Sequence, residues 1–276
     1  MKKIKIVTDS ASSLPGYLAE KYNISIIEIP VHLGGKNIPT GSLDYFYKLL
    51  REGNMPTTSA PSPGSYYQVY KEACKEYDTV ISIHISGKVS GTYQSACLAR
   101  EMLEDEDIRV VDSENISMAT GFLTLVAARA AGEGYSVDEI IDKIDKMKHK
   151  VGGLVALPTL KYLAKGGRVS QISALLGNIL AIKPILIINS GEVKLTDKAR
   201  SVPQALTRMI KMVEERIGDA RVRVAVIHSD AQEKAATYLE KVSENLNCAE
   251  SFIAEMGPGL AVHGGPGMMG LVWMEE

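Results

Sequence analysis

A loop dense in hydroxyls and glycines, SGKVSGT at residues 86–92, is the stretch of the sequence best suited to bind a ligand. It follows an apolar run (80–85) typical of a buried strand, and a helical segment from Thr92 to Glu104 follows it. Ser90 is expected to cap that helix, whose free N–H groups attract an anion. For this segment alone, a capped turn without a ligand is the simpler interpretation.

A serine hydrolase is one alternative. Ser90, then Asp112 or Asp230, then His263 occur in the chain order of the α/β-hydrolases. The nucleophile elbow of those enzymes places one residue between the serine and each flanking glycine, and Gly87-Lys88-Val89-Ser90-Gly91 does not have that spacing. An esterase or thioesterase that uses Ser90 and His263 therefore stays as the second hypothesis.

Hydroxyl side chains recur at several probable strand ends, with few cations beside them. This combination favours hydrogen bonding to a carboxylate over neutralisation of a phosphate. A helix that begins at Met118 carries small and apolar residues around Gly121, where a thin apolar ligand could pass, although close packing explains the same residues. A module that binds a sugar or an organic acid is a third hypothesis. The hydroxyls are those of Ser10, Thr58, Ser59, Ser86 and Ser90.

The sequence offers no site for a cofactor or a metal. The run GPGMMG (265–270) fits the dinucleotide fingerprint, but only six residues follow it, too few for the helix and acidic residue that the site needs. A phosphate-binding P-loop is absent. The five histidines are scattered without the spacing of metal ligands. We therefore expect no cofactor and no metal.

Composition excludes further classes of protein. The 276 residues include 31 basic and 33 acidic side chains, so a nucleic-acid partner is not expected. No segment reaches the roughly 20 apolar residues of a membrane span. The N-terminal segment MKKIKIVTDS is basic, but its apolar run is too short for the core of a signal peptide. Together with three widely spaced cysteines, these features predict a cytoplasmic protein.

The order of elements predicts an α/β fold with two domains. Strands and helices alternate over residues 1–150, which indicates a parallel sheet with helices on both faces. In the second domain, residues 151–276, the pair Ser190-Gly191 between two apolar runs predicts a hairpin, and hence a mixed sheet. Ile24 to Val31 is expected to be one strand, and the glycine-rich segment around His263 a turn.

Seven motifs, in unbroken order along nearly the whole chain, resemble the DegV family. They are VTDSASSLP, TTSAPSPGSY, SGKVSGTYQSA, VVDSENISMATG, LKYLAKGGRVS, IKPIL and HGGPGMMG. The resemblance implies a fatty-acid-binding subunit of bacterial fatty acid kinase rather than an enzyme on its own. One long-chain fatty acid is expected in the first domain, with its carboxylate at the domain junction. A separate kinase would phosphorylate that carboxylate, and the acyl phosphate would feed phospholipid synthesis.

The resemblance also implies roles for individual residues. Thr58 and Ser90 correspond to hydroxyl partners of the carboxylate, and Arg168 and His263 to head-group residues that act in phosphoryl transfer. The chain differs from the usual family pattern at Ala60, where glutamine is common, and at Gly264, within a run that often reads Thr-His-Thr-Gly. The full set of expected ligand-binding residues is Thr58, Ser59, Ser90, Gly91, Thr92, Gly121, Arg168 and His263.

Overall fold

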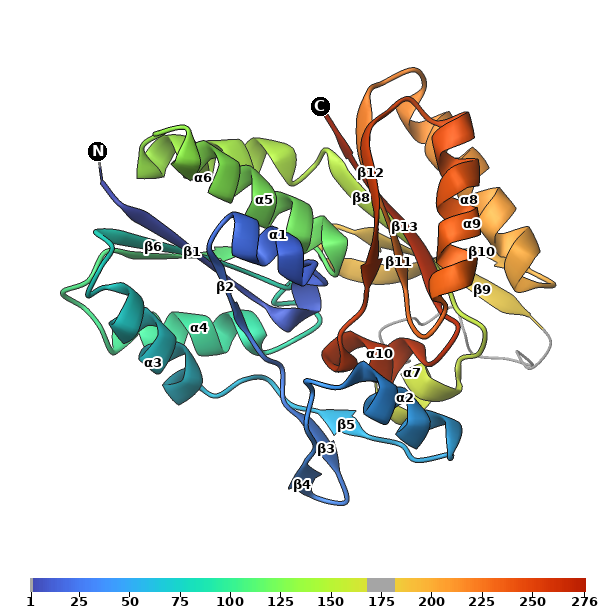
Figure 1. Cartoon of the computed structure of the whole chain (residues 1–276), viewed down its shortest axis with the longest axis horizontal. Coiled ribbons are helices and arrows are strands. Elements are labelled where there is room, and N and C mark those ends of the chain that lie inside the picture. The colour runs from blue at the N-terminus through green and yellow to red at the C-terminus, as the bar shows by residue number, and fades with distance from the viewer. Residues whose placement is uncertain (1, 168–181) are drawn as a thin grey trace.

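The computed structural model describes residues 2–167 and 182–276, which form two large β-sheets surrounded by helices (Figure 1). The first sheet is parallel throughout, with the strand order β2-β1-β6-β7. Its strands span Ile4–Asp9 (β1), Ile24–Ile27 (β2), Thr79–His84 (β6) and Ile108–Asp112 (β7). The predicted parallel sheet is confirmed.

Helices cover both faces of this sheet, with α5 and α6 on one face and α3 and α4 on the other (Figure 1). Ser62 begins α3 by accepting the N–H of Ser65 at 3.2 Å. Ser136 and Glu139 form a capping box at the start of α6. The helical elements of this half are η1 (Ser10–Ser12), α1 (Gly16–Lys21), α2 (Leu43–Arg51), α3 (Pro63–Ala73), α4 (Thr92–Glu101), α5 (Met118–Gly132) and α6 (Val137–Met147).

The second sheet has six strands in the order β10-β9-β8-β13-β11-β12. All neighbours are antiparallel except β11 and β12, so the predicted mixed sheet is confirmed. Ser190 and Gly191 form the predicted hairpin turn, and both have positive φ. The strands are β8 (Val151–Ala156), β9 (Lys183–Asn189), β10 (Glu192–Ala199), β11 (Val222–His228), β12 (Cys248–Glu255) and β13 (Met269–Glu275).

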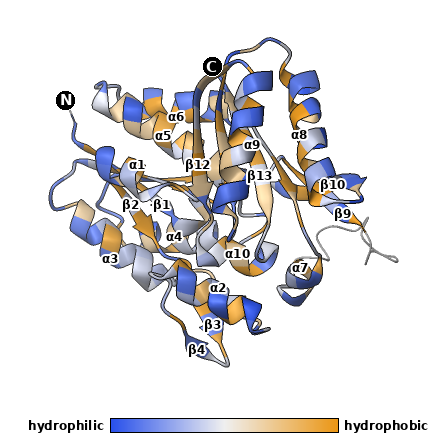
Figure 2. Cartoon of the chain, turned by 45° about the vertical axis from the view of Figure 1, so that its right-hand side comes forward, coloured by the Kyte–Doolittle hydropathy of each residue, from blue (hydrophilic) through white to orange (hydrophobic). Residues whose placement is uncertain are grey.

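Two helices, α8 (Val202–Ile217) and α9 (Gln232–Asn245), cover the outer face of the six-stranded sheet (Figure 1). Both carry polar residues toward solvent and apolar residues toward the sheet (Figure 2). Ser201 begins α8 by accepting the N–H of Gln204 at 3.3 Å. The apolar residues of α8 and α9 and those of the outer face of the sheet form a core of their own.

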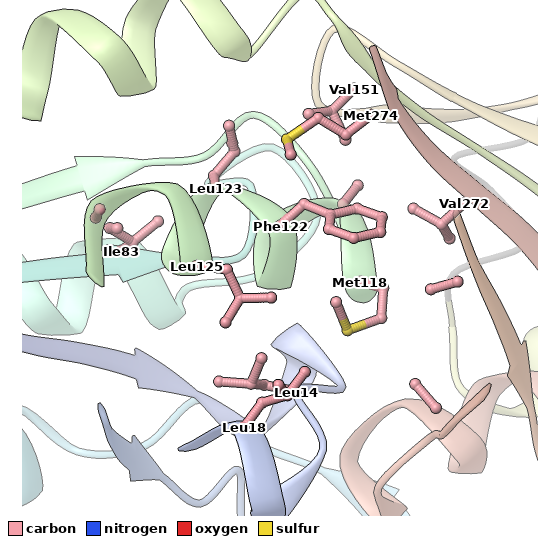
Figure 3. Close-up of a cluster of buried hydrophobic side chains, with 14 of the residues drawn as sticks. Leu14, Leu18, Ile83, Met118, Phe122, Leu123, Leu125, Val151, Val272 and Met274 are labelled. Atoms are coloured by element: carbon pink, nitrogen blue, oxygen red, sulfur yellow. The ribbon is translucent and has the colours of Figure 1, made fainter. Parts of the chain in front are cut away.

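Helix α5 lies between the two sheets and joins their cores. Every residue from Met118 to Leu125 is buried, as expected for a helix that is apolar on all sides. Phe122 packs edge-on against Phe252 of β12 at 5.9 Å between ring centroids. Figure 3 shows Phe122 and Met118 on the side of α5 that faces Val272 of β13. The core thus runs across the expected domain boundary near residue 150.

Two expectations about local structure are wrong. The segment Ile24 to Val31 is not one strand, because Pro30 has no N–H for a ladder and β3 (Val31–Leu33) starts a separate small sheet with β4 (Lys36–Asn37) and β5 (Thr57–Thr58). The segment around His263 is not a turn but a helix, α10 (Pro258–Gly264), with Pro258 at its first position. A further short helix, α7 (Lys161–Lys165), packs beside α10.

Candidate functional site

A largely apolar cavity lies between the loops of the first sheet and the inner face of the second. Both halves of the chain contribute to its wall. The first half supplies Ile29, Ile85, Val89 and Ile116, and the second supplies Val155, Leu157, Leu163, Leu186, Ile188, Val193, Ile227, Met256, Leu260 and Met268. Aliphatic and methionine side chains without charge suit a hydrocarbon ligand.

Polar groups gather at one end of this cavity. Thr58, Ser59, Ser90 and His263 line it there, and we refer to these four residues as the mouth cluster. Among the described lining residues, only Ser59 and Gly91 are exposed, so this end opens to solvent. The cavity therefore combines an apolar interior with an open end that carries hydrogen-bonding groups.

Two loops and one helix bring the mouth cluster together. Thr58 Oγ1 lies 3.0 Å from Nε2 of His263, a hydrogen bond between the small sheet and α10. A Cβ placed on Gly91 would lie 3.7 Å from that of Ala60, so the loop after β6 borders the segment after β5. Three residues far apart in the sequence, Thr58, Ser90 and His263, thus face one cavity.

The loop after β6 differs from its prediction in one detail. Gly91, not Ser90, is the N-cap residue of α4. Ser90 Oγ still accepts the N–H of Thr92 at 3.3 Å and lies 2.7 Å from the Thr92 hydroxyl. Thr92 itself is buried and does not line the cavity. Ser90 and Gly91 line the cavity, while Thr92 bonds to Ser90 without lining it.

The helix α10 can carry His263 into the cavity only because a glycine lies opposite. A side chain at Gly166 would collide with the imidazole of His263. Gly264, the next residue on the helix, also lines the cavity, and a side chain there would collide with Met268. The departure at Gly264 from the family pattern therefore falls at a position packed against Met268.

Two of the expected ligand-binding residues, Thr92 and Gly121, do not line this cavity. Gly121 is not among the lining residues, because α5 packs so closely there that a Cβ would lie 2.9 Å from the backbone oxygen of Ser12. The small residues of α5 allow close packing here, and the expected tunnel along Gly121, which is not part of this cavity, stays a prediction. Arg168 lies outside the described residues.

The geometry does not assemble the serine hydrolase triad considered above. Ser90 bonds to Thr92, and His263 Nε2 bonds to Thr58. Asp112 accepts the N–H groups of Gly87 and Glu114 at 3.1 and 2.8 Å, and Asp230 pairs with Arg51. Both candidate carboxylates are thus held by other groups.

The hairpin of β9 and β10 closes one side of the cavity. Its strands contribute Ile188 and Val193 to the wall. Its tip contacts the loop after β6, where Ser86 Oγ donates to the carbonyl of Gly191 at 2.8 Å. Lys88 Nζ donates to the carbonyl of the neighbouring Ser190, also at 2.8 Å. These two bonds join the halves of the chain at the cavity.

A second array of histidine and hydroxyl groups lies entirely inside the first half of the polypeptide. It consists of Asp9, His84, Ser82 and Tyr70, and we call it the buried network. His84 Nδ1 lies 2.9 Å from Asp9 Oδ2, and Nε2 lies 2.6 Å from Ser82 Oγ. Tyr70 donates to Ser82 at 2.8 Å, and burial raises the pKa of its phenol, so the hydroxyl stays protonated. All four residues are fully buried. No substrate can reach this arrangement of an aspartate, a histidine and a serine.

Two polar features of the cavity were missed from the sequence. His32 of β3 lies 2.9 Å from Ser59 Oγ, through Nε2. Ser117 lines the cavity, with its hydroxyl 2.9 Å from that of Ser13. The pairing of β3 with β5 brings His32 to Ser59, and no spacing rule links residues 27 positions apart across an unpredicted strand.

Within the ranges that the structure describes, no cluster of side chains could hold a metal ion. No helix there has the length and apolar character needed to cross a membrane. The three cysteines are half-buried and unpaired with one another.

Comparisons with known proteins place the chain in a family. The model of "Uncharacterised protein, DegV family" matches residues 3–276, and the chain belongs to the DegV family. It is 36% identical over 280 residues to a DegV domain-containing protein of Caldanaerobacter subterraneus subsp. tengcongensis, with full coverage of both chains. The fold matches the solved structure of a fatty-acid-binding DegV family protein from Thermus thermophilus with a TM-score of 0.92, at 32% identity and full coverage of both. It also matches DegV, a fatty acid binding protein from Bacillus subtilis, with a TM-score of 0.91, at 31% identity and full coverage of both.

Proposed function

We propose that this chain binds one long-chain fatty acid in the cavity, with the carboxylate at the mouth cluster. The observation that carries the proposal is the division of the cavity wall into an apolar interior and a hydroxyl- and imidazole-lined open end. Fatty-acid binding by the structurally similar DegV proteins of Thermus thermophilus and Bacillus subtilis supports it.

The free energies of tail burial and of head-group hydrogen bonding indicate different roles for the two ends of the ligand. Burial of about 14 methylenes at roughly 0.8 kcal/mol each contributes on the order of 11 kcal/mol before the costs of association. A single hydroxyl contact adds only about 0.5–1.5 kcal/mol. The tail therefore supplies the affinity, while Thr58 and Ser90 orient the head group.

An acid held in this way presents its reactive end to solvent. We propose that a separate kinase phosphorylates the carboxylate to an acyl phosphate for phospholipid synthesis, and that the chain acts in the cytoplasm as a carrier. His263 would face the transferred phosphoryl group, together with Arg168. The absence of a dinucleotide or P-loop motif in the sequence fits a division of labour in which the nucleotide is bound by the partner.

Native mass spectrometry of the purified chain tests the proposal, followed by organic extraction and identification of the released lipid. We expect one C14–C18 acid per chain. The delipidated chain, reloaded with palmitic acid, should then give acyl phosphate with ATP only when the cognate kinase is present. A chain that never retains an acid, or that hydrolyses a chromogenic ester through Ser90, would contradict the carrier function.

A further inference from the structure

Thr58 and Ser59 are consecutive residues at the cavity, and each hydroxyl is held by a histidine from a different element. Thr58 bonds to His263 of α10 at 3.0 Å, and Ser59 bonds to His32 of β3 at 2.9 Å. Strand pairing fixes the second contact, because β3 and β5 are antiparallel with Val31 opposite Thr58. The N–H of Ser59 also donates to the carbonyl of Pro30 at 3.3 Å. Ser59 is therefore anchored through both its backbone and its side chain.

His32 matters because the Ser59 hydroxyl has a single proton, which it can donate either to His32 or to the ligand. A serine hydroxyl has one proton, and a carboxylate can only accept hydrogen bonds. If Ser59 donates its proton to His32, it has none to offer a ligand. If Nε2 of His32 carries the proton and donates it to Ser59 Oγ, the Ser59 proton is available to the carboxylate. The next residue, Ala60, also lines the cavity but brings only a methyl group.

We infer that His32 is a positioning residue for the fatty-acid head group and favours a carboxylate over an uncharged head of similar size. It does so by donating to Ser59, which turns the Ser59 hydroxyl into a donor toward the ligand. Hydrogen bonds to a charged acceptor are roughly twice as strong as those between neutral groups. The contribution of His32 should therefore appear for an acid and be small for an ester. This inference rests on the proposed function, because it assumes that the carboxylate lies at the mouth cluster.

The test compares palmitic acid with methyl palmitate, measured by displacement of a fluorescent fatty acid from the delipidated chain. For His32→Leu we expect palmitate affinity to fall about three- to tenfold, while methyl palmitate affinity changes by less than about twofold. His32→Gln should restore palmitate binding, because its amide nitrogen can donate to Ser59 from a similar position. His149→Leu, an exposed histidine that does not line the cavity, is the matched control and should change neither affinity.

A double-mutant cycle excludes a merely structural role. In the Ser59→Ala background, His32→Leu should have no further effect on palmitate, since the hydroxyl through which His32 acts on the ligand has been removed. Equal losses for acid and ester, or losses that simply add to those of Ser59→Ala, would overturn the inference while leaving the proposed function intact. An unaltered chain that binds neither compound would instead overturn the proposed function and this inference with it.

Discussion

The buried network and the mouth cluster contain the same kinds of side chain in opposite surroundings. In the buried network, hydrogen bonds link Asp9 to His84, His84 to Ser82 and Ser82 to Tyr70, and every member is fully buried. In the mouth cluster, His263 bonds to the Thr58 hydroxyl, and both residues line a largely apolar cavity that opens to solvent. The comparison teaches that residue types alone do not define a site, because the more triad-like of the two arrays has no access to a ligand.

The difference predicts that the buried network stabilises the fold and that the mouth cluster does not. His84→Ala would remove one hydrogen-bond partner from each of the buried Asp9 and Ser82, and with it the ring that packs edge-on against Tyr66 at 5.0 Å. The free energy of unfolding should fall by roughly 3–5 kcal/mol, as measured by chemical denaturation. His263→Ala, the matched control, should lower it by less than about 1 kcal/mol because water can replace the lost contacts. Equal losses for the two variants would remove the distinction.

The second prediction concerns transfer rather than stability. His263→Ala and Arg168→Ala should keep palmitate bound and lower the rate of phosphorylation by the cognate kinase about 10²-fold, the typical cost of one group that stabilises charge in a transition state. Lipid retained after purification is measured beside kinase-dependent acyl phosphate. If retained lipid and product decrease together, these residues act in ground-state binding instead.

The third prediction sharpens the contrast between the cavity wall and the core behind it. Val193 and Leu195 are half-buried residues two positions apart on β10, and only Val193 lines the cavity. Val193→Phe should fill part of the cavity and lower palmitate affinity at least about tenfold, since excess volume in a packed site costs roughly 1–3 kcal/mol. Leu195→Phe should leave affinity within about twofold of the unaltered chain. A similar loss in both variants would show that distortion of the strand, not occupation of the cavity, causes the effect.

The smallest effect is expected for single hydroxyls at the mouth. Thr58→Ala and Ser90→Ala should each weaken palmitate binding by about 0.5–1.5 kcal/mol, the net contribution of one hydrogen bond. Titration calorimetry on the delipidated variants measures this directly. Complete loss of binding on removal of the Ser90 hydroxyl would assign Ser90 a role other than orienting the head group.

Local patterns predicted most of the fold. Apolar runs located the strands of both sheets, Ser62-Pro63 located the start of α3, and Ser190-Gly191 located the hairpin, because each signal lies within a few residues of the structure that it encodes. The missed elements lack such a signal. The glycines of α10 concealed a helix whose formation depends on packing, and the two-residue strand β5 exists only through its pairing with β3.

The candidate site was predictable only in part for the same reason. Thr58, Ser90 and His263 were expected from family motifs, and the structure brings them to one cavity. His32 and the aliphatic wall on the hairpin of β9 and β10 depend on contacts between distant segments. Gly121 was expected beside the acyl chain but does not line this cavity, because small residues on a helix serve close packing as readily as they make room for a ligand.

A crystal structure of the chain with palmitic acid tests the central claim most directly. We predict electron density for one acid in the cavity, with carboxylate oxygens within about 3.2 Å of the Thr58 and Ser90 hydroxyls and the tail between Ile188 and Leu260. A second groove, between α8 and α9 and bordered by Leu206 and Tyr238, is the alternative place for an acyl chain. An acid bound in that groove, or one in the cavity with its carboxylate directed away from the mouth cluster, would contradict the account.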